Sequence, residues 1–215
     1  MEKSVLSIIA GLAATVLAPA AQAADLPLDS PWEGFYAGVH AEYLWGEPTV
    51  DALVPFADGD FDGFAGGVTG GYNHVIDQIL IGIEADLALS EADGVANATT
   101  SGEGLSVDLE WLSTIRGRAG FVHENLLLFV TGGLAMGRLE ADYFGFGPMS
   151  TALDETAVGY TIGAGAEWAV TENVTIKAEY LYIDLANEAL DVQIAGYQGV
   201  GLETSLVRFG VNWQF

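Results

Sequence analysis

The last ten residues, 206–215, constrain the fold of this chain more than any other segment. Apolar side chains occupy every second position there: Val207, Phe209, Val211, Trp213 and Phe215. The residues between them are largely polar. A period of two is the signature of a β-strand, because successive side chains of a strand point to opposite faces. The chain therefore contains a sheet whose two faces meet different environments.

Seven further segments show the same alternation. They cover residues 34–45, 61–73, 79–90, 105–121, 126–139, 156–169 and 174–184. In the segment 105–121 we expect the apolar face to hold Val107, Leu109, Trp111, Ile115 and Ala119. Eight amphipathic strands in sequence predict an all-β fold.

The connections between these strands alternate in length. Three are short turns, at residues 73–78, 122–125 and 170–173, and four are long, at residues 46–60, 91–104, 140–155 and 185–202. Short periplasmic turns and longer outer loops are typical of a transmembrane barrel. A sheet in lipid must close, because an open edge would leave unpaired amides in hydrocarbon. We therefore predict an eight-stranded antiparallel up-and-down transmembrane β-barrel.

A soluble lipocalin-like barrel or sandwich is the competing fold, with its apolar face inward. Three features argue against it. One is the closing strand, which ends in Phe215 as the closing strand of outer-membrane barrels typically does. The polar faces are rich in glycine and carry scattered charges, as a narrow interior would. Aromatic residues also gather near strand ends, where they suit membrane interfaces. These interfacial aromatics are Tyr43, Trp45, Tyr72, Trp168, Tyr182 and Trp213.

The N-terminus predicts export. Lys3 precedes an apolar stretch from Val5 to Leu17, and Ala21-Gln22-Ala23 fits the small-x-small cleavage pattern. This pattern indicates a secretory signal peptide over residues 1–23. We expect a periplasmic linker over residues 24–33 and a barrel domain over residues 34–215, in the cell outer membrane of a Gram-negative bacterium.

Composition excludes several classes of function. A formal net charge of -24, with six Lys and Arg residues, argues against nucleic-acid binding. The absence of cysteine rules out disulfides and thiolate metal sites. We expect no cofactor and no defined metal site.

Eight charged residues are predicted to point into the barrel: Glu42, Glu84, Asp86, Arg116, Arg118, Lys177, Glu179 and Arg208. An eight-stranded barrel is just wide enough for side chains to fill it, and buried charges must be paired. Glu84 and Asp86 should meet Arg116 and Arg118 at one level, and Glu179 should stand in a similar relation to Arg208. The set is interpreted as a structural plug of salt bridges, or as a narrow ion path gated by them.

Catalysis is not expected. His74 and His123 fall at the periplasmic turns, and His40 is expected to be a hydrogen-bonded residue of the lumen. The glycine pairs 66–67 and 70–71 lie within a strand, whereas a phosphate-binding loop requires a helix to follow. Close packing in a narrow barrel explains them better.

Several stretches, in their order and spacing, are shared with one family. They include Trp32-Glu-Gly-Phe-Tyr-Ala-Gly, Gly63-Phe-Ala-Gly-Gly-Val-Thr-Gly-Gly-Tyr-Asn, Thr114-Ile-Arg-Gly-Arg-Ala-Gly, Lys177-Ala-Glu-Tyr-Leu-Tyr and Arg208-Phe-Gly-Val-Asn. Together they resemble the RopB-like alphaproteobacterial outer-membrane proteins, relatives of the OmpA barrel domain. The resemblance implies an abundant surface component or antigen, described loosely as porin-like. It also implies that the barrel-assembly machinery reads Phe215 and that no peptidoglycan-binding domain follows.

The expected role is therefore structural: an integral, surface-exposed, envelope-stabilising barrel. A narrow porin-like channel is the first alternative. An adhesin or ligand receptor acting through the acidic outer loops is the second. Expected partners are membrane lipid, lipopolysaccharide and, at the acidic loops, divalent cations, since hard cations prefer carboxylate oxygens.

Overall fold

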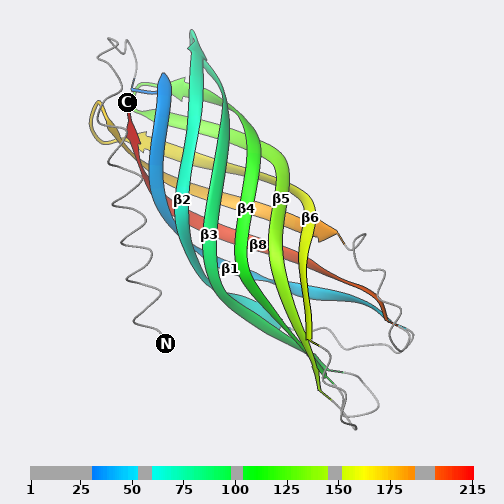
Figure 1. Ribbon diagram of the computed structural model, residues 1–215. Coiled ribbons are helices and arrows are strands. Elements are labelled where there is room, and N and C mark those ends of the chain that lie inside the picture. The colour runs from blue at the N-terminus through cyan, green and yellow to red at the C-terminus, as the bar shows by residue number, and fades with distance from the viewer. Residues whose placement is uncertain (1–30, 53–59, 98–103, 145–151, 187–196) are drawn as a thin grey trace.

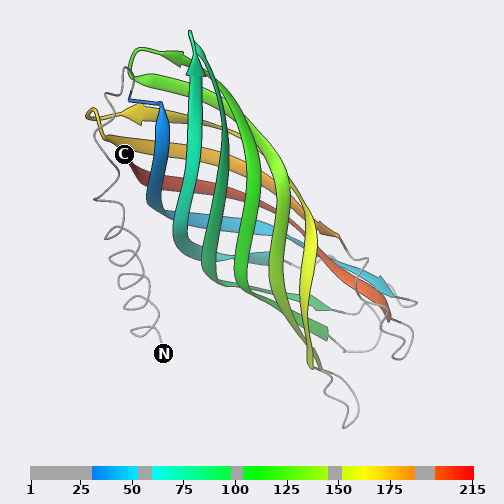
Figure 2. The ribbon, with the colours of Figure 1, turned by 45° about the horizontal axis from the view of Figure 1, so that its top comes forward.

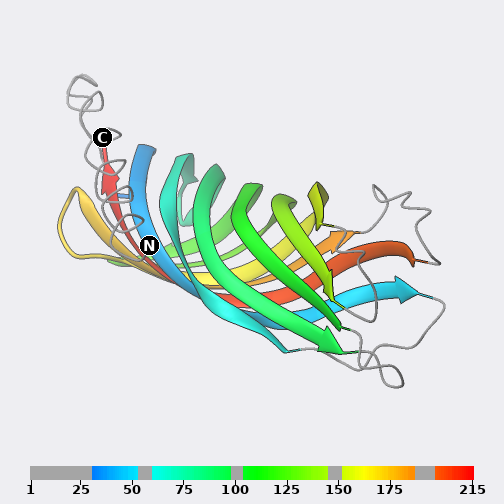
Figure 3. The same cartoon turned by 60° about the horizontal axis from the view of Figure 1, so that its bottom comes forward.

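The computed structural model describes residues 31–52, 60–97, 104–144, 152–186 and 197–215, so the expected signal peptide lies outside the described residues. Eight strands form one closed antiparallel barrel, as predicted, because the first strand pairs with both the second and the last (Figures 1 and 3). Among the described residues, no helix is long and apolar enough to cross a bilayer. The strands are β1 (Gly34–Ala52), β2 (Asp60–Ile76), β3 (Ile79–Asn97), β4 (Gly104–His123), β5 (Leu126–Phe144), β6 (Ala152–Ala169), β7 (Val174–Ala186) and β8 (Tyr197–Gln214).

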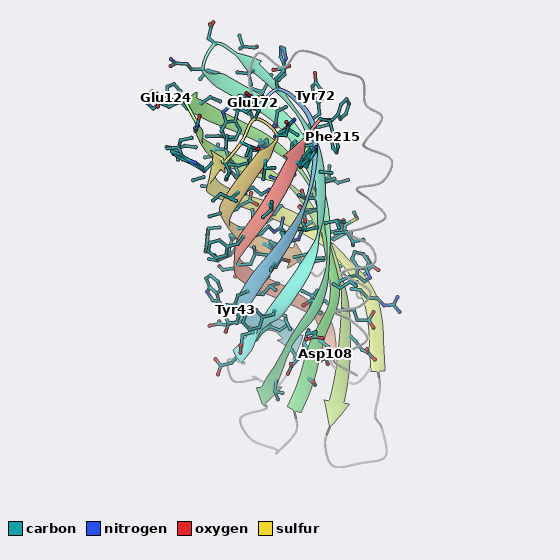
Figure 4. The ribbon with its side chains drawn as sticks, turned by 90° about the vertical axis from the view of Figure 1, so that its left-hand side faces the viewer. Tyr43, Tyr72, Asp108, Glu124, Glu172 and Phe215 are labelled. Atoms are coloured by element: carbon teal, nitrogen blue, oxygen red, sulfur yellow. The ribbon has the colours of Figure 1, made fainter. Side chains whose placement is uncertain are left out.

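The two ends of the barrel differ. At one end the strands are joined by short turns, two of which hold a residue in the left-handed region, Asp77 (φ 57°) and Glu124 (φ 52°). The C-terminus lies at this end, together with Glu124 and Glu172 (Figure 4). This short-turn end corresponds to the periplasmic end expected from the sequence.

Two aromatic girdles bound an apolar outer surface. Tyr72, Trp168 and Trp213 lie near the short turns, whereas Tyr43, Trp45 and Tyr182 lie towards the other end; Figure 4 shows Tyr43 and Tyr72 well separated along the barrel. Val174 pairs with Trp213, and Tyr182 is eight residues further along β7. Eight residues span about 27 Å of strand. With a tilt of roughly 40°, this gives about 20 Å, close to the apolar band of transmembrane barrels. We call this region the membrane band.

The strands continue well past the outer girdle. β3 ends at Asn97, where the sequence pattern predicted residue 90, and β8 begins at Tyr197, where it predicted 206. Beyond the girdle the outer ends separate into two groups, β1 with β8 and the strands β2 to β6 (Figure 2), because β1–β2 pairing stops at Gly46. We call these parts of the strands the outer extension.

The polarity of both faces reverses between the membrane band and the outer extension. On β3, Ile83 and Leu87 face outward in the band, whereas Glu91 and Asp93 face outward beyond it. The inward face changes in the opposite sense on β7, from Lys177 and Glu179 to three buried apolar residues, Leu181, Ile183 and Leu185. Apolar outward faces end at this reversal, which is why the strands predicted from them are too short.

A β-bulge in β4 reverses the side-chain orientation that was predicted for part of this strand. Val107 and Leu109, expected on the outward face, are buried inside the barrel. The register of β4 against β5 shifts between Leu109 and Trp111, which leaves Glu110 as an extra residue that faces out. One extra residue exchanges the two faces of the rest of the strand.

Candidate functional site: a charged layer in the lumen

The membrane band encloses a layer of buried charges. All eight predicted lumen residues lie in it, and Glu167 of β6 joins them. Strand alternation turns each of these side chains inward, and none is more than 5% exposed. We call the nine residues the charged layer: Glu42, Glu84, Asp86, Arg116, Arg118, Glu167, Lys177, Glu179 and Arg208.

Arg116 joins two walls of the barrel. Its Nη2 lies 2.5 Å from Glu84 Oε1 and 3.0 Å from Asp86 Oδ2, both on the neighbouring strand β3. Its Nη1 reaches Glu179 Oε1 on β7 at 2.7 Å. The planar guanidinium fork suits such multiple pairing. The predicted neighbourhood of Glu84 and Arg116 is direct, since the two residues are register partners.

Glu84 is the most heavily paired carboxylate. Lys177 Nζ crosses the lumen from β7 and lies 2.8 Å from Oε1 and 2.7 Å from Oε2. The Tyr36 hydroxyl donates to Oε2 at 2.6 Å, and Arg118 Nη1 lies 3.4 Å from the same oxygen. Four strands, β1, β3, β4 and β7, therefore meet at one side chain.

Arg208 does not form its shortest contacts with Glu179, the partner predicted for it. It is the register partner of Glu179, but its Nη1 lies 4.0 Å from Glu179 Oε2. Its shorter contacts run to Glu42 Oε2, at 2.6 Å from Nε, and to Asp86 Oδ2, at 3.0 Å from Nη1. Glu179 turns to Arg116 instead, because side chains in so narrow a lumen reach strands beyond their neighbours.

Glu167 lies on the short-turn side of the layer. It accepts hydrogen bonds from Arg118 Nη2 at 2.8 Å, Asn212 Nδ2 at 2.7 Å and the Thr175 hydroxyl at 2.5 Å. Arg118 also lies against the ring of Phe129, with its Cζ 4.5 Å from the ring centroid. In the alternating segment 156–169, Glu167 falls on the face opposite Trp168, and this position is the sequence signal that indicates an inward side chain.

His40 lies in the lumen but is not hydrogen-bonded, contrary to expectation. Both ring nitrogens are buried without a hydrogen-bond partner, and Nε2 lies 3.9 Å from Glu42 Oε2. Its register partners are Gly67 and Gly210, which bring no side-chain acceptor to the ring.

Apolar side chains close the lumen on both sides of the charged layer. At the short-turn end, Trp32 packs with Leu80, Leu127 and Phe129, and its Nε1 donates to the Glu124 carbonyl at 3.3 Å. In the outer extension a larger cluster fills the interior, including Leu44, Phe61, Leu109, Leu181, Ile183, Leu185, Leu202 and Leu206.

The other two histidines lie at the short-turn end. His74 Nδ1 lies 2.8 Å from Glu33 Oε1, and the Val75 amide donates to Glu33 Oε2 at 2.6 Å. Partial burial raises the pKa of the Glu33 carboxyl, but these hydrogen bonds and the charge of His74 outweigh it and lower that pKa. Within the described ranges, no three His, Asp or Glu residues are grouped to hold a metal ion.

Comparisons with known proteins agree with this architecture. The family model "Outer membrane protein beta-barrel domain" matches residues 10–215. A 31 kDa outer-membrane immunogenic protein of Brucella melitensis is 33% identical over 97% of this chain and 99% of its own length. A 22 kDa outer membrane protein of Rhizobium leguminosarum is 32% identical over 91% of this chain and 83% of its own.

Among solved structures, the outer membrane protein OprG from Pseudomonas aeruginosa is similar in fold, with a TM-score of 0.55 and 10% identity over 87% of this chain and 99% of that chain. The Rhizobium and Brucella relatives agree with the alphaproteobacterial resemblance of the sequence motifs. The chain is an outer-membrane protein of a Gram-negative bacterium and belongs to the outer membrane protein β-barrel family.

Proposed function

We propose that this protein is a closed structural barrel that stabilises the outer membrane and presents its loops at the cell surface, without catalysis. The observation that carries the proposal is the stacking of three fillings along the lumen. The Trp32 cluster, the charged layer and the outer apolar cluster follow one another from the short-turn end outward.

Each filling opposes the passage of ions. The charged layer is cross-linked between opposite walls by Arg116 and Lys177. Apart from the Trp32 Nε1–H group, which donates to the Glu124 carbonyl, the two clusters consist of apolar side chains that cannot replace the hydration shell of an ion, and stripping that shell is costly. A narrow channel would therefore require both apolar fillings and the ion pairs to move.

Recording from the refolded, unmodified barrel in a planar bilayer tests this proposal. A closed barrel gives no discrete current steps at moderate voltage in molar potassium chloride. Reproducible unitary steps, scaling with salt concentration, would contradict it and favour the narrow gated channel. In cells, loss of the protein should increase leakage of periplasmic enzymes in dilute detergent, and restoring it should reverse that leakage.

Surface presentation is the second part of the proposal. The immunogenic relatives in Brucella support it, as do the acidic outward residues of the outer extension, such as Asp62, Glu91 and Glu203. These carboxylates suit divalent cations that also bridge lipopolysaccharide phosphates. Protease added to intact cells should cleave the long loops and spare the short turns.

Assembly is proposed to depend on Phe215. The Phe215 amide donates to the Phe35 carbonyl at 3.0 Å, so the last residue helps to join β8 to β1. We expect deletion of Phe215 to lower the amount of barrel inserted by the assembly machinery far more than removal of one loop residue. Normal surface levels of the truncated protein would contradict this expectation.

A further inference from the structure

The charged layer does not balance. Among the residues whose side chains the structure describes, its buried acids are Glu42, Glu84, Asp86, Glu167 and Glu179, and its buried bases are Arg116, Arg118, Lys177 and Arg208. Five acidic side chains thus face four Lys and Arg side chains. An uncompensated charge in a medium of low dielectric constant is expensive, and such a site gains from binding a positive charge.

The excess negative charge is localised at Glu42. Glu84 contacts three cations, and Asp86 contacts two. Glu167 accepts three hydrogen bonds, and Glu179 lies within 4.0 Å of three cations. Glu42 has Arg208 as its one Lys or Arg partner, and its Oε1 has no hydrogen-bond partner. Glu179 Oε2 also lacks a hydrogen-bond partner, but Lys177 and Arg208 both lie within 4.0 Å of it.

A fifth base stands beside this carboxylate. His40, two residues earlier on β1, has a side chain fully shielded from solvent, and its Nε2 lies 3.9 Å from Glu42 Oε2. Both of its ring nitrogens lack a hydrogen-bond partner, so each can accept or donate without breaking a bond. The two glycines that flank His40 in the register, Gly67 and Gly210, add no side chain that would hold the ring in place.

We propose that the charged layer binds one proton at neutral pH, held between the imidazole of His40 and the carboxylate of Glu42. With this proton the layer is electrically neutral. The charged groups that surround His40 come from four strands, and they are Glu42 of β1, Glu84 and Asp86 of β3, Lys177 of β7 and Arg208 of β8. β2 contributes Gly67 at this level and no titratable group. The proton can be bound whether or not the barrel conducts ions.

A proton bound in the folded barrel makes the stability of the barrel depend on pH. The folded barrel holds a proton that the unfolded chain releases in neutral solution, so folding takes up a proton. Stability must then fall as pH rises above the range in which the unfolded chain loses the proton, until the folded barrel loses it as well. One proton corresponds to an increase of up to about tenfold in the unfolding equilibrium constant per pH unit.

The experiment uses a parent barrel with His74→Asn and His123→Asn, which leaves His40 as its one histidine. Urea unfolding in lipid vesicles is measured from pH 6 to pH 9, followed by tryptophan fluorescence. We expect the unfolding constant of the parent to rise with pH. Glu42→Gln removes the carboxylate that shares the proton with His40, so this rise should disappear. Glu167→Gln also leaves four acids and four bases but keeps Glu42 beside His40, so it should lower stability yet keep the rise.

Two results would overturn the proposal. One is a parent whose unfolding constant does not change between pH 6 and pH 9. The other is a Glu42→Gln barrel with the same pH dependence as the parent. The first result has a specific form. If stability does not depend on pH but increases when sodium replaces choline at constant ionic strength, the missing positive charge is an alkali cation and not a proton.

A second measurement needs no change in the charged layer. Nitrogen NMR of the 15N-histidine-labelled parent reports on the His40 ring alone. We expect its resonances to shift in a single step at the upper end of the pH range over which stability falls. Resonances that keep the values of a neutral imidazole at every pH would contradict a shared proton, even if Glu42→Gln does not fold.

Discussion

Below the outer aromatic girdle, the strands turn apolar side chains outward and charged side chains inward; above it, the two faces exchange. On β3, the outward residues change from Ile83 to Asp93, while the inward residues change from Glu84 to Ala92. Lipid surrounds the first region and water the second. A continuous strand can therefore satisfy two solvents, because alternation lets each segment assign its polar face independently.

The lumen is filled differently in the membrane band and in the outer extension. In the membrane band, the inward face holds the charges that the lipid-facing surface excludes. These charges are stable only when paired, since an isolated charge there would be buried on every side. In the outer extension, the inward face is an ordinary apolar core, as in a soluble barrel. The same change of polarity should therefore have opposite effects in the two regions.

The largest expected effect comes from removing a cation from the charged layer. Arg116→Met leaves Glu84, Asp86 and Glu179 without their shared partner, and should lower the free energy of unfolding by about 3–5 kcal/mol. Arg138→Met is the matched control in the outer extension. Arg138 pairs with Glu110 at 3.0 Å, but both side chains are more than two-fifths exposed. We expect a change below about 1 kcal/mol there.

Urea titrations of the two variants in vesicles make this comparison. A double-mutant cycle of Arg116 with Glu84 sharpens it, because coupled residues depart from additivity. Strictly additive effects of the two substitutions would mean that the charged layer is not a cross-linked plug.

The second effect concerns the apolar filling of the outer extension. Ile183 is fully buried inside the barrel, and Ile183→Ala should cost about 2–5 kcal/mol through lost burial and a residual cavity. Val95, which faces outward in the same region and is 40% exposed, provides the control. Val95→Ala should stay within about 0.5 kcal/mol. Equal losses for both would indicate that the outer extension has no core.

The third effect compares two outward positions on one strand. Ala164 lies midway along the membrane band on β6, and Thr156 lies beyond the girdle on the same strand. An arginine on the lipid face near the bilayer midplane costs about 2–4 kcal/mol. Ala164→Arg should therefore lower stability by that amount, and Thr156→Arg by almost nothing. A loss at Thr156 as large as that at Ala164 would place lipid around the outer extension.

The smallest effect lies at the short-turn end. Because the pKa of Glu33 is lowered in the folded barrel, its contribution to stability is present above the unfolded pKa of about 4.3 and is lost as pH falls through the folded value. Glu33→Gln should cost up to about 1 kcal/mol at pH 7. The unfolding curves of the variant and the wild type should converge in acid. A difference that persists at pH 3 would show that charge is not the cause.

Much of the fold could be predicted because lipid imposes a simple rule. An outward face must be apolar throughout the membrane band, and the clear alternation of strands such as 79–90 follows from that rule. The rule ends at the outer girdle, so the alternation of 91–97 was interpreted as loop. The bulge at Glu110 was missed for a similar reason: an extra residue is visible only against the register of the neighbouring strand.

The residues of the charged layer could be predicted from the sequence, but the contacts between them could not. Inward alternation identified its members, and direct register partners such as Glu84 and Arg116 could be inferred. The contact of Glu179 with Arg116 rather than Arg208 depends on reach across the lumen. Sequence spacing carries no information about that distance. The unbonded ring of His40 was hidden for the same reason.

Cysteine scanning along β3 tests the reversal of polarity most directly, because the chain has no cysteine of its own. Single substitutions at Ala85, Ala92 and Asp93 are treated, in intact outer membranes, with a charged thiol reagent that cannot enter lipid. We expect labelling at Asp93→Cys, no labelling at Ala85→Cys because lipid covers it, and none at Ala92→Cys because the apolar core encloses it. Labelling at Ala92→Cys with protection at Asp93→Cys would mean that the two faces do not exchange.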